Sequence, residues 1–268
     1  MDIFVENLVQ VWDDGGDGVR ALDGITHRFR SGTLTCLLGP SGCGKSTLAQ
    51  IVGGIESATS GTIRIVDPKT PGAPPAAPGQ CSVMMWQSLN LFPWRNVIDN
   101  VAFGLEMAGV PREARYARAR ELIALVGLRN FEEKACSQLS GGMRQRVALA
   151  RALIMDRPIL LMDEPFAALD AQTKIVMQEE LTRIFERLRN TILFVTHAID
   201  EAILLGDEVV VMTARPGRIK EVIPIDLPRP RTQEMVGTKD FGALYDRILH
   251  LIREEVLNAM RQQDEALA

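Results

Sequence analysis

A glycine-rich segment between two apolar runs does most to restrict how this chain can fold. Residues 39–47 read Gly-Pro-Ser-Gly-Cys-Gly-Lys-Ser-Thr, which fits the pattern G-x-x-x-x-G-K-[ST]. The run before it, 33–38, is short and apolar, as a buried strand requires, and residues 46–52 have helical spacing. A strand, a tight loop and a helix in that order surround an anion with backbone N–H groups and the positive end of a helix. The segment therefore predicts a phosphate site in an α/β fold.

The residues of this loop have separate expected roles in binding a nucleotide. Glycines allow successive backbone N–H groups to turn towards the β- and γ-phosphates, and Lys45 brings a full positive charge to the phosphate oxygens. The hydroxyl of Ser46 is placed to ligate Mg²⁺, a hard cation that prefers oxygen ligands. A glycine-rich turn with a solvated lysine is the alternative, but it leaves the flanking strand and helix unexplained. We expect ATP contacts from Gly39, Pro40, Ser41, Gly42, Cys43, Gly44, Lys45, Ser46 and Thr47.

Cys43 lies inside the same loop, close to the expected start of the helix. A helix N-terminus lowers the pKa of a nearby thiol and makes it more reactive. We therefore expect alkylation or oxidation of Cys43 to block ATP binding. An inert small residue is the alternative.

A second apolar run ends in two adjacent carboxylates. Residues 159–162 are long enough for a parallel strand that is buried on both faces, and Asp163 and Glu164 follow directly. Open α/β sheets bind their ligands at the carboxyl ends of their strands. An Asp-Glu pair alone is usually part of a solvated loop, but in a chain with a phosphate loop it favours a catalytic role. Asp163 is expected to hold Mg²⁺, and Glu164 to orient and deprotonate the attacking water.

A third segment, residues 139–151, predicts a helix whose first turn is free to bind a ligand. Ser140 can cap this helix, and Gly141 and Gly142 leave its first N–H groups uncovered, while apolar residues follow at helical spacing. Such a helix start can bind an anion. Residue chemistry alone does not say which molecule carries that anion.

Residues 138–153 resemble, without interruption, the signature motif of the ATP-binding-cassette (ABC) superfamily. The resemblance implies an ATPase with ATP and Mg²⁺ as cofactors. In this superfamily the signature motif of one copy contacts the γ-phosphate of ATP held by a second copy, so that two ATP molecules join a head-to-tail homodimer. The resemblance assigns this contact in trans to Ser140, Gly141, Gly142 and Gln145.

The same resemblance implies roles for four further residues. Gln87 corresponds to the loop glutamine that senses Mg²⁺ and water and moves with a membrane partner, and His197 to the histidine that contacts the γ-phosphate. His197 also follows a β-rich run, 191–196, which places an imidazole at the end of a strand. Asp170 corresponds to the aspartate that crosses the dimer interface. Trp12 has the spacing of the aromatic residue that stacks on adenine, although a tryptophan in an amphipathic strand ordinarily packs in a core or at its rim.

The order of these patterns predicts an α/β fold: a P-loop NTPase core with a mixed sheet, an antiparallel β subdomain and an inserted α-helical subdomain. We expect a nucleotide-binding domain over 1–225, with the helical subdomain over about 96–155, and a C-terminal extension over 226–268. Residues 159–225 predict alternating strands and helices, as in a doubly wound parallel sheet. Apolar residues recur at helical spacing over 241–256, so the extension predicts an amphipathic helix. This helix could pack on its own core, or face an interface or a membrane surface.

Charge and hydropathy exclude some classes of protein. The formal net charge of the 268-residue chain is −4, so no basic field favours nucleic acid as a partner. No stretch approaches the length of a transmembrane helix, and the first residues lack the basic and apolar regions of a signal peptide. We expect a cytosolic protein, bound peripherally at the cytoplasmic face of the inner or plasma membrane.

An apolar loop beside the expected active site indicates what the ATPase drives. Residues 90–97 are unusually apolar for such a loop, which suggests a docking surface for a short cytoplasmic helix of a separate transmembrane permease. The chain as a whole resembles the ATPase subunits of nitrate, sulfonate and taurine importers, through residues 91–94, 100–105, 213–219 and 227–231. The resemblance implies ATP-driven uptake of a small anion, with a solute-binding protein as an indirect partner.

Other functions stay open at this point. The transported solute does not touch the ATPase subunit in such importers, so an importer of an unrelated small solute is possible. A soluble ABC ATPase without a membrane partner is a further alternative. Glu164 and His197 argue against an inactive nucleotide-binding module.

Overall fold

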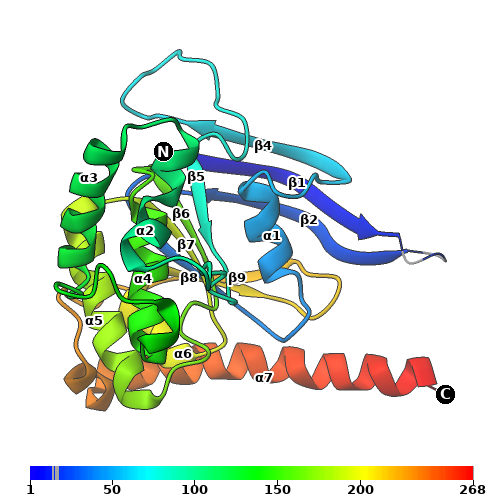
Figure 1. Cartoon of the computed structure of the whole chain (residues 1–268). Coiled ribbons are helices and arrows are strands. Elements are labelled where there is room, and N and C mark those ends of the chain that lie inside the picture. The colour runs from blue at the N-terminus through cyan, green and yellow to red at the C-terminus, as the bar shows by residue number, and fades with distance from the viewer. Residues whose placement is uncertain (14, 16–17, 268) are drawn as a thin grey trace.

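The computed structural model describes residues 1–13, 15 and 18–267, with side chains as far as Arg261. Figure 1 shows an antiparallel sheet above a larger sheet, a group of helices on one side, and one long helix along the base. The expected α/β class, with a mixed sheet and an antiparallel sheet, is confirmed.

The larger sheet has six strands in the order β5-β6-β7-β3-β8-β9. Neighbouring strands are parallel except for β8 and β9, which are antiparallel. The expected alternation of strands and helices therefore extends only as far as β8, because a short loop without a helix joins β8 to β9 and reverses the chain. The strands are β5 (Ser82–Met85), β6 (Ile159–Asp163), β7 (Thr191–Val195), β3 (Leu34–Leu38), β8 (Glu208–Met212) and β9 (Ile219–Pro224).

The smaller sheet is antiparallel, with the order β2-β1-β4. Its strands are β1 (Asp2–Trp12), β2 (Val19–Phe29) and β4 (Ser60–Val66). Helix α1 (Lys45–Val52) packs between this sheet and the larger one, since its buried residues share a core with both.

Three helices, α2 (Val97–Met107), α3 (Arg112–Leu125) and α4 (Gly141–Leu153), pack against one another within the range expected for the helical subdomain. A short 3₁₀ helix, η1 (Cys136–Gln138), precedes α4. Helices α5 (Ala171–Leu188) and α6 (Ile199–Leu205) connect strands of the larger sheet.

The expected C-terminal helix is α7 (Lys239–Leu267), which follows a second 3₁₀ helix, η2 (Gln233–Gly237). Phe241 and Ile248 are buried, and the helix contacts α6 and β8, so it packs on the core of its own chain. In Figure 1 its far end extends on the same side of the molecule as the far end of the β1–β2 pair. No helix in the described ranges combines the length and the apolar character needed to cross a bilayer.

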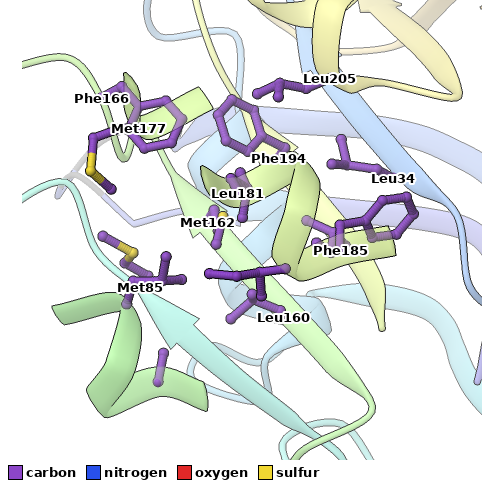
Figure 2. Packing of buried hydrophobic residues seen from close by; sticks show 14 of the residues in the cluster. Leu34, Met85, Leu160, Met162, Phe166, Met177, Leu181, Phe185, Phe194 and Leu205 are labelled. Carbon is purple, nitrogen blue, oxygen red and sulfur yellow. The ribbon is translucent and has the colours of Figure 1, made fainter. Parts of the chain in front are cut away.

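Strands of the larger sheet send alternate side chains into two separate cores. Leu160 and Met162 of β6 pack with the helices, whereas Ile159 and Leu161 pack towards α1 and the antiparallel sheet. Figure 2 shows the first core, where residues of β6 and β7 lie beside Leu181 and Phe185 of α5. Burial on both faces explains why these strands read as continuous apolar runs. The two cores fix the carboxyl ends of β3, β6 and β7, from which the predicted site residues follow.

Candidate active site

The loop between β3 and α1 has the backbone shape that its glycines predict. Gly42 and Gly44 have φ values of +75° and +97°, which side chains other than glycine rarely adopt. A Cβ atom on Gly44 would also lie 2.5 Å from Cδ2 of Leu22. Both backbone conformation and space therefore require glycine at position 44.

Lys45 lies at the centre of this loop. Its side chain is buried, and its Nζ donates to the carbonyl oxygens of Gly39 and Pro40, each at 2.8 Å. The loop thus holds an ammonium group among backbone groups that surround it closely.

Two residues that were expected to hold Mg²⁺ meet in the structure, although 117 residues separate them in sequence. Oγ of Ser46 donates to Oδ1 of Asp163 at 2.8 Å. Burial raises the pKa of Asp163, while the Ser46 hydrogen bond and the charge of Lys45 oppose that shift. A hydroxyl and a carboxylate beside a phosphate loop are the oxygen donors that Mg²⁺ prefers, so this pair could hold the ion.

Gln87, Glu164 and His197 were predicted to act on water and the γ-phosphate, and Glu164 contacts both of the others. Its Oε2 accepts a hydrogen bond from Nε2 of Gln87 at 3.3 Å, and its Oε1 pairs with Nε2 of His197. These residues follow β5, β6 and β7, which are neighbours in the sheet. Glu164 has a φ of +46°, and its N–H donates to the carbonyl of Val195 at 3.0 Å. A non-glycine residue in this region is strained, as residues at functional sites often are.

These groups line one cavity of about 470 Å³. Two of the residues that line the cavity, Ala21 of β2 and Arg215 from the loop after β8, were not predicted from the sequence. A signal for Arg215 was present: β8 is a buried apolar run beside β3, so its carboxyl end lies at the same edge of the sheet. Trp12 ends β1 with 36% of its surface exposed and is outside the set that lines the cavity. That set is Ala21, Ser41, Gly42, Gly44, Lys45, Ser46, Thr47, Gln87, Glu164, His197 and Arg215.

The start of α4 lies at a different cavity. Ser140 caps this helix, and its Oγ accepts from the N–H of Met143 at 3.3 Å. Ser140 and Gly142 line a space of about 440 Å³ together with Thr173 and Val176 of α5. Among the described residues that line the two cavities, none is common to both. One copy of the chain therefore does not bring the α4 start and the phosphate loop together.

Two predicted residues, Gln145 and Asp170, lie outside the set that lines the phosphate cavity. Gln145 is 2% exposed, and its buried Nε2 has no hydrogen-bond partner among the described residues, so it does not face the surface as a contact in trans requires. Asp170 caps α5 by accepting from the N–H of Thr173 at 3.0 Å and from its hydroxyl at 2.7 Å. The Thr173 N–H bond is the largest contribution to the lowered pKa of Asp170.

The expectation of a reactive Cys43 is wrong. The side chain is 1% exposed, and burial raises the pKa of its thiol despite the nearby charge of Lys45. Desolvation therefore outweighs the helix N-terminus on which the expectation rested. The structure favours the alternative, an inert small residue in the loop.

Fold and site together define a P-loop nucleotide-binding cassette: a phosphate loop between β3 and α1, with Asp163 and Glu164 at the end of β6. The profile of the ABC transporter family matches residues 22–167, and the chain belongs to this family. It is an ATPase of the ABC type.

Relatives and solved structures agree with this assignment. The chain is 45% identical to a taurine import ATP-binding protein of Burkholderia pseudomallei over 209 residues, 78% of each chain. It is 39% identical to a nitrate import ATP-binding protein of Synechocystis over 259 residues, 94% of this chain and 96% of the relative. A dimeric ATP-binding cassette solved in a post-hydrolysis state with ADP and Pi is 26% identical, with a TM-score of 0.71 over 84% of this chain and all of the other.

Proposed function

We propose that the chain is the ATP-hydrolysing subunit of an importer that takes up a small anion such as nitrate, an aliphatic sulfonate or taurine. The names of the nitrate and taurine relatives support this substrate class. One observation carries the ATPase mechanism: Gln87, Glu164 and His197 meet at the cavity of the phosphate loop, whereas Ser140 lines another cavity of the same chain.

In the proposed reaction, Lys45 and the N–H groups of the loop bind the phosphates of ATP. Ser46, Asp163 and Gln87 would hold Mg²⁺, and the bound ion would supply positive charge beside the phosphates. Glu164 takes a proton from the attacking water, and His197 holds the Glu164 carboxylate from one side and contacts the γ-phosphate.

The remaining part of each site comes from a second copy of the chain. The capped start of α4 presents Ser140 and the N–H groups of Gly141 and Gly142, which suit the γ-phosphate of ATP bound by the partner. The dimeric state of the related cassette supports this arrangement. Asp170 borders the same region through its bonds to Thr173, so its segment would lie at the interface. Gln145 is buried, so it has no part in this contact in trans.

Trp12 ends a strand of the antiparallel sheet, with about a third of its surface open. Adenine stacking on this ring would remove apolar surface from water. The structural division that goes with this function is a nucleotide-binding domain over 1–225 with an extension over 226–268.

A transmembrane permease would dock near the loop that follows Gln87. Trp94 is 78% exposed there, and Phe92 and Phe103 border a groove of about 350 Å³. Arg151 of α4 donates to the carbonyls of Leu89 and Asn90 at 2.5 and 2.6 Å. A helix in this groove would therefore move the loop and α4 together, which couples the permease to the dimer interface. The subunit would bind at the cytoplasmic face of the membrane, with a solute-binding protein as an indirect partner and no role for nucleic acid.

ATP turnover by the purified chain tests the proposed chemistry. Glu164→Gln is expected to lower turnover by about 10²- to 10⁴-fold, because it removes the base but keeps the shape of the side chain. The affinity for ATP should stay at the wild-type level. Glu179→Gln, on the exposed face of α5, is the matched control and should turn over ATP at the wild-type rate. Equal rates for the wild type and Glu164→Gln would refute the assignment of the base.

Copurification tests the membrane partner. The tagged chain, extracted with mild detergent from its native membranes, should bring a permease with it, and Trp94→Ala should reduce the amount recovered. Recovery of the wild-type chain without any membrane protein would favour the alternative, a soluble ABC ATPase.

A further inference from the structure

The loop between β8 and β9, residues 213–218, lies next to the phosphate loop and is held by hydrogen bonds. The Thr213 hydroxyl accepts from the N–H of Arg218 at 2.9 Å and lies 3.0 Å from the carbonyl oxygen of Pro216. Gly217 donates its N–H to the carbonyl of Ala21 at 2.9 Å. A Cβ atom on Gly217 would lie 2.0 Å from the carbonyl oxygen of Cys43, so the two loops are in direct contact.

Helix α7 holds the same loop from the other side. Glu255 is 7% exposed, and its Oε2 accepts from the N–H of Ala214 at 2.9 Å. Its Oε1 pairs with Nζ of Lys220 in β9 at 2.8 Å. Among the residues that the structure describes, the neighbouring Glu254 pairs with Lys220 and His250 and makes no bond to the loop itself. Glu255 is thus the carboxylate that ties α7 to residue 214.

Arg215 extends from this loop to the phosphate cavity. Its Nε and Nη2 donate to the carbonyl oxygen of Gly42, each at 3.3 Å, and the side chain lines the cavity that contains Lys45 and Ser46. Within the described ranges it forms no ion pair with a carboxylate. A guanidinium has five N–H donors, and these two bonds leave others free. The planar fork of arginine matches phosphate oxygens better than any other cationic side chain does.

We propose that Arg215 is a further nucleotide-contacting residue, which donates to a phosphate oxygen of bound ATP, and that Glu255 of α7 positions it. This inference rests on the proposed ATPase function and deepens it. It gives the C-terminal helix a part in nucleotide binding, because α7 holds the backbone from which Arg215 reaches the site.

Calorimetric titration with ATP tests the contact. Arg215→Gln should raise the dissociation constant for ATP about tenfold, the loss expected for one charge-assisted hydrogen bond to phosphate. Arg253→Gln, on an exposed position of α7, is the control and should bind ATP as the wild type does. An unchanged dissociation constant for Arg215→Gln would overturn the proposal. Lys45→Ala separates this result from a failure of the proposed function: if the wild type does not bind ATP more tightly than Lys45→Ala, the nucleotide site itself is wrong.

Steady-state kinetics tests the positioning residue. Glu255→Ala should raise the KM for ATP several-fold with kcat nearly unchanged, whereas Glu254→Ala should match the wild type. Glu255→Gln keeps an oxygen that accepts from Ala214 and should restore much of the KM. In an Arg215→Gln background, Glu255→Ala should raise KM no further, because the contact it supports is already lost. If Glu255→Ala raises KM equally in the wild-type and Arg215→Gln backgrounds, Glu255 stabilises the fold without positioning Arg215. Melting temperatures identify variants that do not fold.

Discussion

Gly44→Ala is the most informative single change in the phosphate loop, because two independent features of the structure oppose it. The residue has a φ of +97°. A Cβ atom there would also lie 2.5 Å from Cδ2 of Leu22 and 2.9 Å from the carbonyl oxygen of Ala21. Gly24 is a matched control, since its φ is +69° but a Cβ atom would meet nothing within 4 Å.

The two features make separable contributions to the free energy of unfolding. A non-glycine residue in the left-handed region costs about 1–2 kcal/mol. Forcing extra atoms into a closely packed site costs about 1–3 kcal/mol more. Gly44→Ala should therefore lower the free energy of unfolding by about 2–5 kcal/mol, whereas Gly24→Ala should lower it by about 1–2 kcal/mol.

Urea unfolding followed by circular dichroism measures both values under the same conditions. The midpoint should fall further for Gly44→Ala than for Gly24→Ala, with similar slopes. Equal losses for the two variants would refute the reasoning, since they would mean that the loop relaxes away from Leu22 at no cost.

Three further predictions use the same measurement or a simple chemical probe. Asp170→Ala should lower the free energy of unfolding through loss of the α5 cap, whereas Asp170→Asn should lower it much less because asparagine also caps. Equal losses for the two variants would contradict the capping role. Burial works to raise the pKa of Glu208, but hydrogen bonds from His27 and Thr35 outweigh it and hold the pKa below its usual 4.5. Glu208→Gln should therefore cost about 1–3 kcal/mol at neutral pH, and the difference from the wild type should shrink as the pH falls through that lowered pKa; a pH-independent difference would count against this account. Finally, iodoacetamide should label Cys81, which is half-buried, long before Cys43; rapid labelling of Cys43 in peptide mass spectrometry would contradict its burial.

The parts of the site that could be predicted from the sequence are those whose functional residues are adjacent in the chain. The phosphate loop, the carboxylates at the end of β6 and the cap of α4 are local patterns, and each lies in the structure where its flanking apolar run predicts. The pairing of Ser46 with Asp163 follows from strand order, because β3 and β6 flank β7 and end at the same edge of the sheet.

Other features depend on tertiary contacts that no local pattern reports. The pKa of Cys43 is raised by burial of its side chain in the core beside α1, and the position of Gln145 is set by how α4 packs. Arg215 reaches the site only because the β8–β9 loop packs on the phosphate loop. The strained backbone of Glu164 has no signature in residue type, since glutamate ordinarily avoids a positive φ.

Disulfide trapping between two separately labelled chains tests the central claim, that each ATP is enclosed by two copies. In a Glu164→Gln background, one chain carries Ser41→Cys in the phosphate loop and the other Ser140→Cys at the start of α4. Mixing the two chains with ATP and a mild oxidant should give an intermolecular disulfide. No disulfide should form with ADP in place of ATP, or with Glu164→Gln chains that lack the added cysteines. Failure of the two positions to cross-link under saturating ATP, with both chains folded and binding nucleotide, would contradict the shared site.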